Sequence, residues 1–140
     1  MNDRPAAKDP VARGATAALA DLVLVLVFAG IGRASHAEGL DPAGLARTAG
    51  PFVVGWLIGW VLVALLPATR GRPRSLLAGA LVWVATVVVG MLVRGGLVGD
   101  GVQTSFVVVT TVVLAVFLLG WRALALLVTR GRARSQAVVT

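Results

Sequence analysis

The sequence predicts an all-α membrane protein in which four transmembrane helices form two hairpins of the same orientation, with both termini in the cytoplasm. Three observations predict this fold. Hydrophobic residues make up 58% of the 140 residues, and the mean hydropathy is +0.91, which is outside the usual range for soluble domains. The apolar residues gather into runs of the length that a bilayer requires. A stretch of the first half of the sequence also recurs in the second half.

The charged residues are few, and basic residues dominate among them. Lys and Arg total 13 against 6 for Asp and Glu, and the formal net charge is +7. In a soluble protein this balance would suggest nucleic-acid binding. Here the basic residues flank the apolar runs, as in membrane proteins, so no nucleic-acid partner is expected. The chain has no Cys and 1 His, so thiol chemistry is excluded and neither a metal nor a cofactor is expected.

The first span is expected over residues 15–32, after a polar tail at 1–14. Asp21 is the only charge within this run. The basic start, the apolar middle and the small-residue ending at Ala37 also resemble a cleaved secretory signal. Asp21 argues against cleavage, because the apolar region of a signal rarely carries a carboxylate, and the repeat requires a span here.

Three further spans follow along the chain. The second is expected over residues 48–69, after a polar loop at 33–47, and it carries no charge over its whole length. The third is expected over 75–93 and the fourth over 102–129. Together the spans form a transmembrane domain at 15–129, and the remaining residues, 130–140, are expected to form a basic tail that frays.

The distribution of Lys and Arg predicts the orientation. With both termini inside, the outer loops hold three basic residues, Arg33, Arg47 and Arg94. The inner segments then hold nine, which are Arg4, Lys8, Arg13, Arg70, Arg72, Arg74, Arg130, Arg132 and Arg134. The positive-inside rule therefore predicts a cytoplasmic N-terminus and C-terminus.

The repeat joins Leu57–Ser75 to Leu118–Ser135. Both stretches contain a Gly-Trp pair, at Gly59 and at Gly120, and both end on Thr-Arg-Gly-Arg-x-Arg-Ser. Chance similarity is the alternative in a chain rich in Ala, Val, Leu and Arg, but hydrophobicity does not explain the polar match. We therefore expect duplicated hairpins related by an axis along the membrane normal.

Each half carries one charge inside a span that the other half lacks. Asp21 corresponds to Val82, and Arg122 corresponds to Val61. A lone charge at this depth costs at least about 2.5–3.5 kcal/mol. We predict an ion pair between Asp21 and Arg122, which would join the first and fourth helices. The alternative is that each side chain extends separately to the inner surface.

Small residues in the spans predict where helices approach closely in lipid. Gly55 and Gly59 form a GxxxG pattern, to be used either within the bundle or at an oligomer contact. Use within the bundle is favoured, because a four-helix chain has internal neighbours to satisfy first. Two further stripes are expected to face the interior: Gly79, Thr86 and Gly90 in the third span, and Thr104 and Thr111 with Arg122 in the fourth.

The outer side holds the remaining polar cluster. Ser35, His36 and Glu38 are of the residue types used in nucleophilic catalysis, but residues this close on one loop rarely form a triad, so no catalytic residue is expected. A recognition site is favoured instead, with Arg33, His36, Glu38 and Arg94 as the candidate ligand-binding residues. The two arginines end equivalent helices and could hold one anionic group between them. The alternative is that they only anchor the helices at headgroup level.

Several short motifs resemble those of the domain-of-unknown-function 3054 family of small integral membrane proteins. The resemblance covers about Ala20 to Arg122 and is carried by Asp21, Gly32-Arg33-x-Ser35-His36, Pro51-Phe52-x-x-Gly55, Gly90-Met91-x-x-Arg94, Ser105-Phe106 and Gly120-Trp121-Arg122. It implies about four helices and a bacterial plasma-membrane location, and it supplies no activity.

These observations favour a non-enzymatic membrane protein, either a small transporter or channel component or a subunit that binds an anionic ligand or lipid. A structural or assembly subunit is the alternative, and an intramembrane enzyme is the least favoured. The expected partners are membrane lipids, with a second copy of the chain or a membrane-complex subunit as further possibilities. A water-accessible cavity reaching from Arg33 and Arg94 to Asp21 and Arg122 would favour transport or ligand binding, whereas a dry, filled interior would favour the structural or assembly role.

Overall fold

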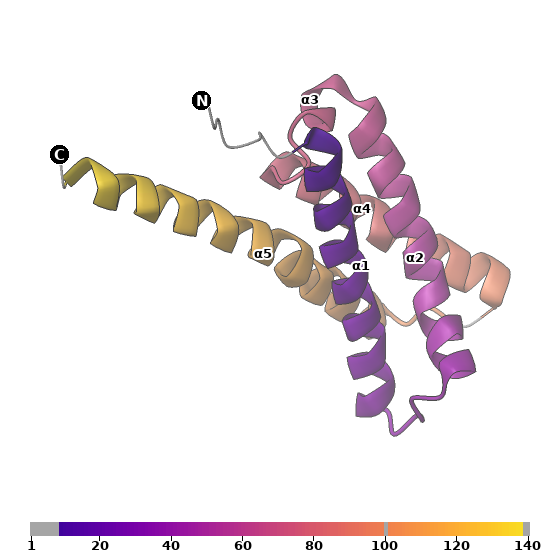
Figure 1. Ribbon diagram of the computed structural model, residues 1–140. Coiled ribbons are helices and arrows are strands. Elements are labelled where there is room, and N and C mark those ends of the chain that lie inside the picture. Colours follow the sequence, from indigo (N-terminus) through magenta and orange to yellow (C-terminus); the bar gives the residue numbers. More distant parts are fainter. Residues whose placement is uncertain (1–8, 100, 139–140) are drawn as a thin grey trace.

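The computed structural model describes residues 9–99 and 101–138, and helices are the regular structure throughout these residues (Figure 1). Four of the helices are long and apolar enough to cross a membrane, so the prediction of an all-helical multi-pass membrane protein is confirmed. The helices are α1 (Pro10–Ser35), α2 (Pro42–Leu65), α3 (Pro67–Arg70), α4 (Leu76–Val93), the π-helical turn η1 (Arg94–Val98) and α5 (Thr104–Val138). Residues 1–8 of the expected N-terminal tail, Asp100, and residues 139–140 of the expected C-terminal tail lie outside the described residues.

The helices α1 and α2 begin before the expected spans, at Pro10 and Pro42. α2 ends at Leu65, short of the expected end at residue 69, because Pro67 interrupts the helix and begins the short α3.

α1 and α2 each have a proline in the first turn, where the missing N–H leaves no intrahelical bond unmade. The Asp41 side chain caps α2 by accepting from the N–H of Gly44 at 2.8 Å, and the Ser75 hydroxyl caps α4 by accepting from the N–H of Ala78 at 3.1 Å. The apolar runs therefore mark the part of these helices that suits hydrocarbon, and polar caps mark where α2 and α4 begin.

The end of α5 also differs from the expectation of a fraying tail after Thr129. The helix continues through Val138, because the residues after Thr129 include several Arg and Ala, which favour helix.

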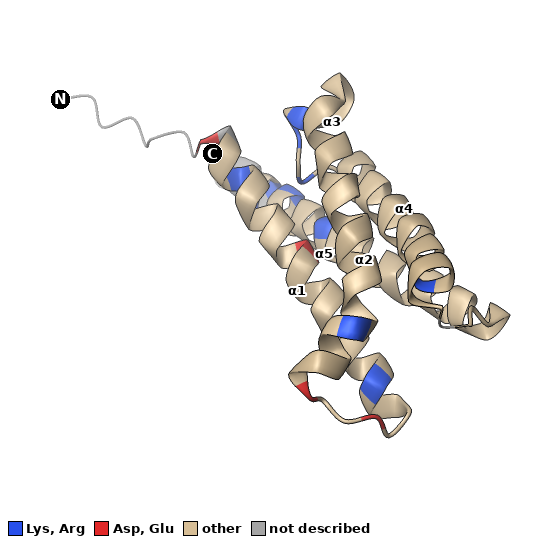
Figure 2. Ribbon diagram, turned by 90° about the vertical axis from the view of Figure 1, so that its right-hand side faces the viewer, with Lys and Arg blue, Asp and Glu red and all other residues tan. Residues whose placement is uncertain are grey.

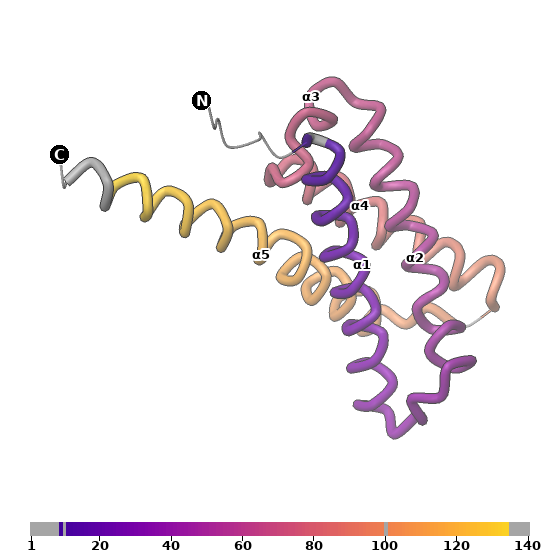
Figure 3. Tube along the Cα trace, viewed as in Figure 1, coloured from indigo at the N-terminus to yellow at the C-terminus, as the bar shows by residue number. Residues whose placement is uncertain are grey.

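The helix α2 packs against both α1 and α4, and α5 crosses these helices steeply (Figure 1). The C-terminal turns of α5 project away from the other helices, as the tube in Figure 3 shows. The short α3 lies at one end of the bundle and the loop between α1 and α2 lies at the other (Figure 1). Most charged residues lie near these two ends, and the middle of the bundle holds few of them (Figure 2).

Glycine permits the close contact between α2 and α4, which is the most extensive helix pair. A Cβ atom on Gly55 would lie 2.7 Å from the Cα of Thr86, and one on Gly59 would lie 2.8 Å from the Cα of Val82. The backbones of the two helices can meet only because both positions lack a side chain. The GxxxG pattern is thus used inside the bundle. A Cβ on Gly90 would likewise meet the ring of Phe52.

The buried stripe of α5 differs from the expected one. Thr104 is exposed and Thr111 is half-buried, so the expectation that this threonine stripe faces the interior is wrong for Thr104. The fully buried positions of the helix are Thr110, Leu114, Leu118 and Arg122. These residues recur every four positions, and such a ridge packs at about 50° to its neighbour, which agrees with the steep crossing of α5 (Figure 1).

We predict that a methyl group at Gly55 destabilises the α2–α4 contact, because it meets backbone rather than a movable side chain. Gly55→Ala should lower the free energy of unfolding in detergent by about 1–3 kcal/mol. Gly120→Ala is the matched control, because nothing lies within 4 Å of the added Cβ and Ala favours helix over Gly. Circular dichroism during denaturation of both purified variants measures the difference. Equal stability of the two variants would contradict the glycine contact.

Candidate functional site

A fully buried ion pair joins α1 to α5. Asp21 and Arg122 are each 0% exposed. Nη1 of Arg122 donates to Oδ1 of Asp21 at 2.7 Å, and Nη2 donates to Oδ2 at 2.8 Å, so the pairing is bidentate. The two residues that the sequence predicts to pair therefore lie in contact. The alternative, in which each side chain extends separately to the inner surface, does not occur, because both side chains are fully buried.

Two tryptophans complete the coordination of the Asp21 carboxylate. Nε1 of Trp121 on α5 donates to Oδ1 at 2.8 Å, and Nε1 of Trp60 on α2 donates to Oδ2 at 3.2 Å. The carboxylate thus accepts from three side chains on two other helices. Sequence reasoning missed both indoles as partners of Asp21, although the repeated Gly-Trp pair had marked them.

The fourth long helix makes room for this cluster. A Cβ on Gly79 of α4 would lie 2.7 Å from Cδ of Arg122, so only glycine lets the arginine stem cross this helix. Arg122 also donates from Nη1 to the carbonyl of Leu118 at 2.7 Å. All four long helices therefore meet at the cluster of Asp21, Trp60, Trp121 and Arg122, which we call the ionic cluster. Its charges are tolerated because protein donors around the carboxylate and protein acceptors around the guanidinium replace most of the water that each would otherwise need. Nε of Arg122 is the exception and has no hydrogen-bond partner among the described residues.

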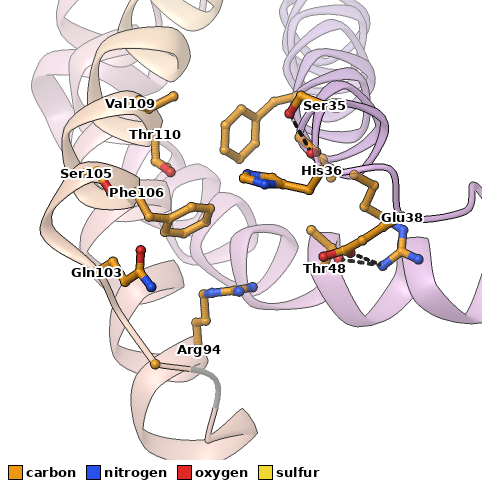
Figure 4. Close-up of a pocket in the computed structure, with 15 residues that line it drawn as sticks. Ser35, His36, Glu38, Thr48, Arg94, Gln103, Ser105, Phe106, Val109 and Thr110 are labelled. Atoms are coloured by element: carbon orange, nitrogen blue, oxygen red, sulfur yellow. Dashed lines mark hydrogen bonds and ion pairs between the residues drawn. The ribbon is translucent and has the colours of Figure 1, made fainter.

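A separate cavity of about 490 Å³ opens at the end of the bundle where α1 ends and α5 begins (Figure 4). We call it the outer cavity. The four candidate ligand-binding residues, Arg33, His36, Glu38 and Arg94, all line it. Its other lining residues are Phe28, Ala29, Gly32, Ser35, Thr48, Gly101, Gln103, Ser105, Phe106, Val109 and Thr110. The structure thus brings together residues from the end of α1 and from the loop before α5, which are distant in the sequence.

Arg33 organises the loop after α1. Its Nε donates to the carbonyl of Gly39 at 2.8 Å, and its guanidinium pairs with Glu38 at 3.0 Å and with Asp41 at 3.3 Å. Two carboxylates therefore balance its charge. This role in shaping the loop goes beyond anchoring a helix at headgroup level.

Arg94 lies on the opposite side of the outer cavity. The central carbon of its guanidinium is 4.7 Å from the ring centroid of Phe106, which is a cation–π distance. Figure 4 shows this guanidinium extending toward the cavity between Gln103 and Thr48. Among the described residues, the cavity lining contains two arginines and one glutamate, and Arg33 is paired with that glutamate and with Asp41.

The Ser, His and Glu of this region do not form a catalytic relay. The Ser35 hydroxyl donates to the carbonyl of Gly32 at 2.8 Å, and Glu38 accepts from Arg33 at 3.0 Å. Both side chains are thus engaged away from His36. Within the described residues, no group of three or more His, Cys, Asp or Glu could hold a metal ion.

Thr110 is a lining residue that sequence reasoning missed. It is 0% exposed, and its Oγ1 has no hydrogen-bond partner among the described residues. Its hydroxyl faces the interior of the outer cavity (Figure 4). No signal in the sequence could have distinguished it from Thr111, because its burial follows from the crossing angle of α5.

A filled core separates the outer cavity from the ionic cluster. The lining ends at Phe28 and Thr110, and Val25 and Leu114, both 0% exposed, occupy the next buried turn of α1 and α5. The described residues therefore form no continuous cavity between Arg94 and Asp21.

Comparison with known proteins gives one finding for this chain. A family model described as "Protein of unknown function (DUF3054)" matches residues 18–125, a range that holds the ionic cluster and every residue that lines the outer cavity. No curated protein matches the chain, and no solved structure matches it.

We predict that the indole of Trp60 stabilises the fold through its bond to Asp21. Trp60→Phe should lower the free energy of unfolding by about 1.5–3 kcal/mol through that bond, because the acceptor is charged. Trp56→Phe is the matched control, since Nε1 of Trp56 is buried with no hydrogen-bond partner among the described residues. Chemical denaturation in micelles compares the two variants. An equal loss of unfolding free energy in both variants would show that packing of the indole, and not the bond to Asp21, accounts for the destabilisation.

Proposed function

The chain belongs to the DUF3054 family of proteins of unknown function, and we propose that it is a multi-pass plasma-membrane protein that binds an anionic ligand in the outer cavity. One observation carries this proposal: a single cavity gathers Arg33 and Arg94 from the ends of two helices. Its volume of about 490 Å³ is that of a small-molecule site. Guanidinium groups suit carboxylate or phosphate oxygens.

The orientation that we propose puts the outer cavity on the extracytoplasmic side of the membrane. The basic turn that holds Arg70, Arg72 and Arg74 lies around α3, at the opposite end of the bundle from the α1–α2 loop (Figure 2). The positive-inside rule assigns this basic end, and with it both termini, to the cytoplasm.

The contacts between helices support a duplicated hairpin. Gly59 packs against Val82 where α2 meets α4. The equivalent positions in the repeat are Gly120 and Asp21, where α5 meets α1, and there Trp121 and Arg122 bond to Asp21. On this reading one copy of the interface kept a glycine contact, whereas the other copy became ionic.

Ligand binding explains the cavity better than conduction does. A conducting path would need a polar route from the outer cavity to the ionic cluster, whereas buried Val25 and Leu114 lie between them. A structural or assembly subunit is the second candidate. It is favoured by the filled core at Val25 and Leu114 between the outer cavity and the ionic cluster, and by the projecting end of α5 (Figure 3).

We predict that an anionic species co-purifies with the protein and depends on Arg94. Arg94→Gln should reduce its occupancy at least about tenfold, which corresponds to one lost charge-assisted interaction. Arg72→Gln is the matched control, because Arg72 is exposed at the other end of the bundle. Native mass spectrometry of protein purified with its native lipids measures the occupancy. Equal occupancy in both variants, or no anionic species on the wild type, would contradict the proposed function.

Single introduced cysteines can test the proposed topology, since the sequence contains no cysteine of its own. Gly39→Cys in the α1–α2 loop should react with a membrane-impermeant maleimide in intact cells. Gly71→Cys beside α3 should react only after the cells are permeabilised, because the basic end is cytoplasmic. The reverse labelling pattern would invert the orientation and leave the cavity facing the cytoplasm.

A further inference from the structure

We infer that the ligand of the outer cavity is an anionic amphiphile, an acylated phosphate or carboxylate that enters sideways from the outer leaflet of the membrane. This inference rests on the proposed function and specifies the class of ligand. Its charged group would lie against Arg94 at the mouth of the cavity. Its apolar body would lie deeper, between α1 and α5.

The lining of the outer cavity changes from polar to apolar along its depth. The loops and helix ends contribute Arg33, His36, Gln103 and Ser105, and the deeper turns contribute Phe28, Ala29 and Val109. Thr110 lies six residues after the start of α5 at Thr104, which is about 9 Å along a helix. A free inorganic anion would use only the first of these two zones, whereas an amphiphile uses both.

One wall of the outer cavity is open at the depth of the apolar zone. Val109 lines the cavity and is also 55% exposed, so this side of α5 is not covered by another helix. Phe28 and Ala29 form the opposite wall on α1 and are buried, at 7% and 1% exposed. An acyl chain in the bilayer can therefore reach the cavity beside Val109 without first crossing the water-facing loops.

The hydroxyl of Thr110 provides an independent indication of the ligand. Its Oγ1 is fully buried and has no hydrogen-bond partner among the described residues, although buried polar groups are nearly always bonded. It faces into the cavity beneath the polar zone (Figure 4). An ester or amide oxygen just below the charged group of an acylated phosphate or carboxylate would accept this hydrogen bond. A plain alkyl anion would leave it unmade.

The test is a native mass spectrometry titration of the full chain in detergent with three probes: short-chain phosphatidic acid, phosphatidylcholine with the same chains, and inorganic phosphate. The wild type should retain phosphatidic acid at least about tenfold better than either other probe. Val109→Trp fills the open wall and should weaken phosphatidic acid binding about tenfold. Val112→Trp is the matched control, because Val112 is equally exposed, at 55%, and does not line the cavity.

Thr110→Val tests the hydroxyl without adding bulk and should weaken phosphatidic acid binding about fivefold. This variant also carries the test if Val109→Trp does not fold. The inference is overturned if inorganic phosphate binds as well as phosphatidic acid, with dependence on Arg94 but not on Val109 or Thr110; the proposed function then stands. If Arg94→Gln changes the binding of neither anion, both the inference and the proposed function are overturned.

Discussion

The fold depends on how the carboxylate of Asp21 is satisfied inside a membrane-spanning bundle. Apolar helices gain little from associating in lipid, because lipid tails are as apolar as their side chains. A buried carboxylate favours association of the helices, because it requires hydrogen-bond donors that lipid does not provide. Here the donors come from Trp60 on α2 and from Trp121 and Arg122 on α5, so one side chain of α1 ties three helices together. Gly79 lets α4 join them by leaving room for the arginine stem.

The position of the ionic cluster also explains where the outer cavity lies. α5 crosses the bundle steeply (Figure 1) and is joined to α1 at Arg122, far from its own N-terminus at Thr104. Between these points Leu114 and Val25 fill the core, and beyond them the two helices leave the outer cavity open toward the loops. The cluster therefore holds α1 and α5 together at one depth of the bundle, and the outer cavity lies where the two helices are no longer joined by it.

Much of this arrangement could be predicted from the sequence, because it follows from composition and spacing. Four apolar runs gave four long helices, and the family resemblance is confirmed. Pairing of Asp21 with Arg122 was one of the two arrangements that the sequence allowed for the charges within the spans. The rest depends on the angle at which α5 crosses, which no local pattern encodes. That angle buries Thr110 and exposes Thr104. The indoles were missed because a tryptophan in an apolar run resembles a packing residue until its N–H is seen to reach a carboxylate.

A double-mutant cycle on Asp21 and Arg122 tests the central claim most directly. Asp21→Asn and Arg122→Gln are made singly and together, and the free energy of unfolding of each protein is measured in the same micelles. Each single substitution leaves a buried charge without its partner and should cost about 3–5 kcal/mol, whereas the double substitution should cost clearly less than the sum. Strictly additive losses, or single variants as stable as the wild type, would contradict the claim that this pair holds the helices together.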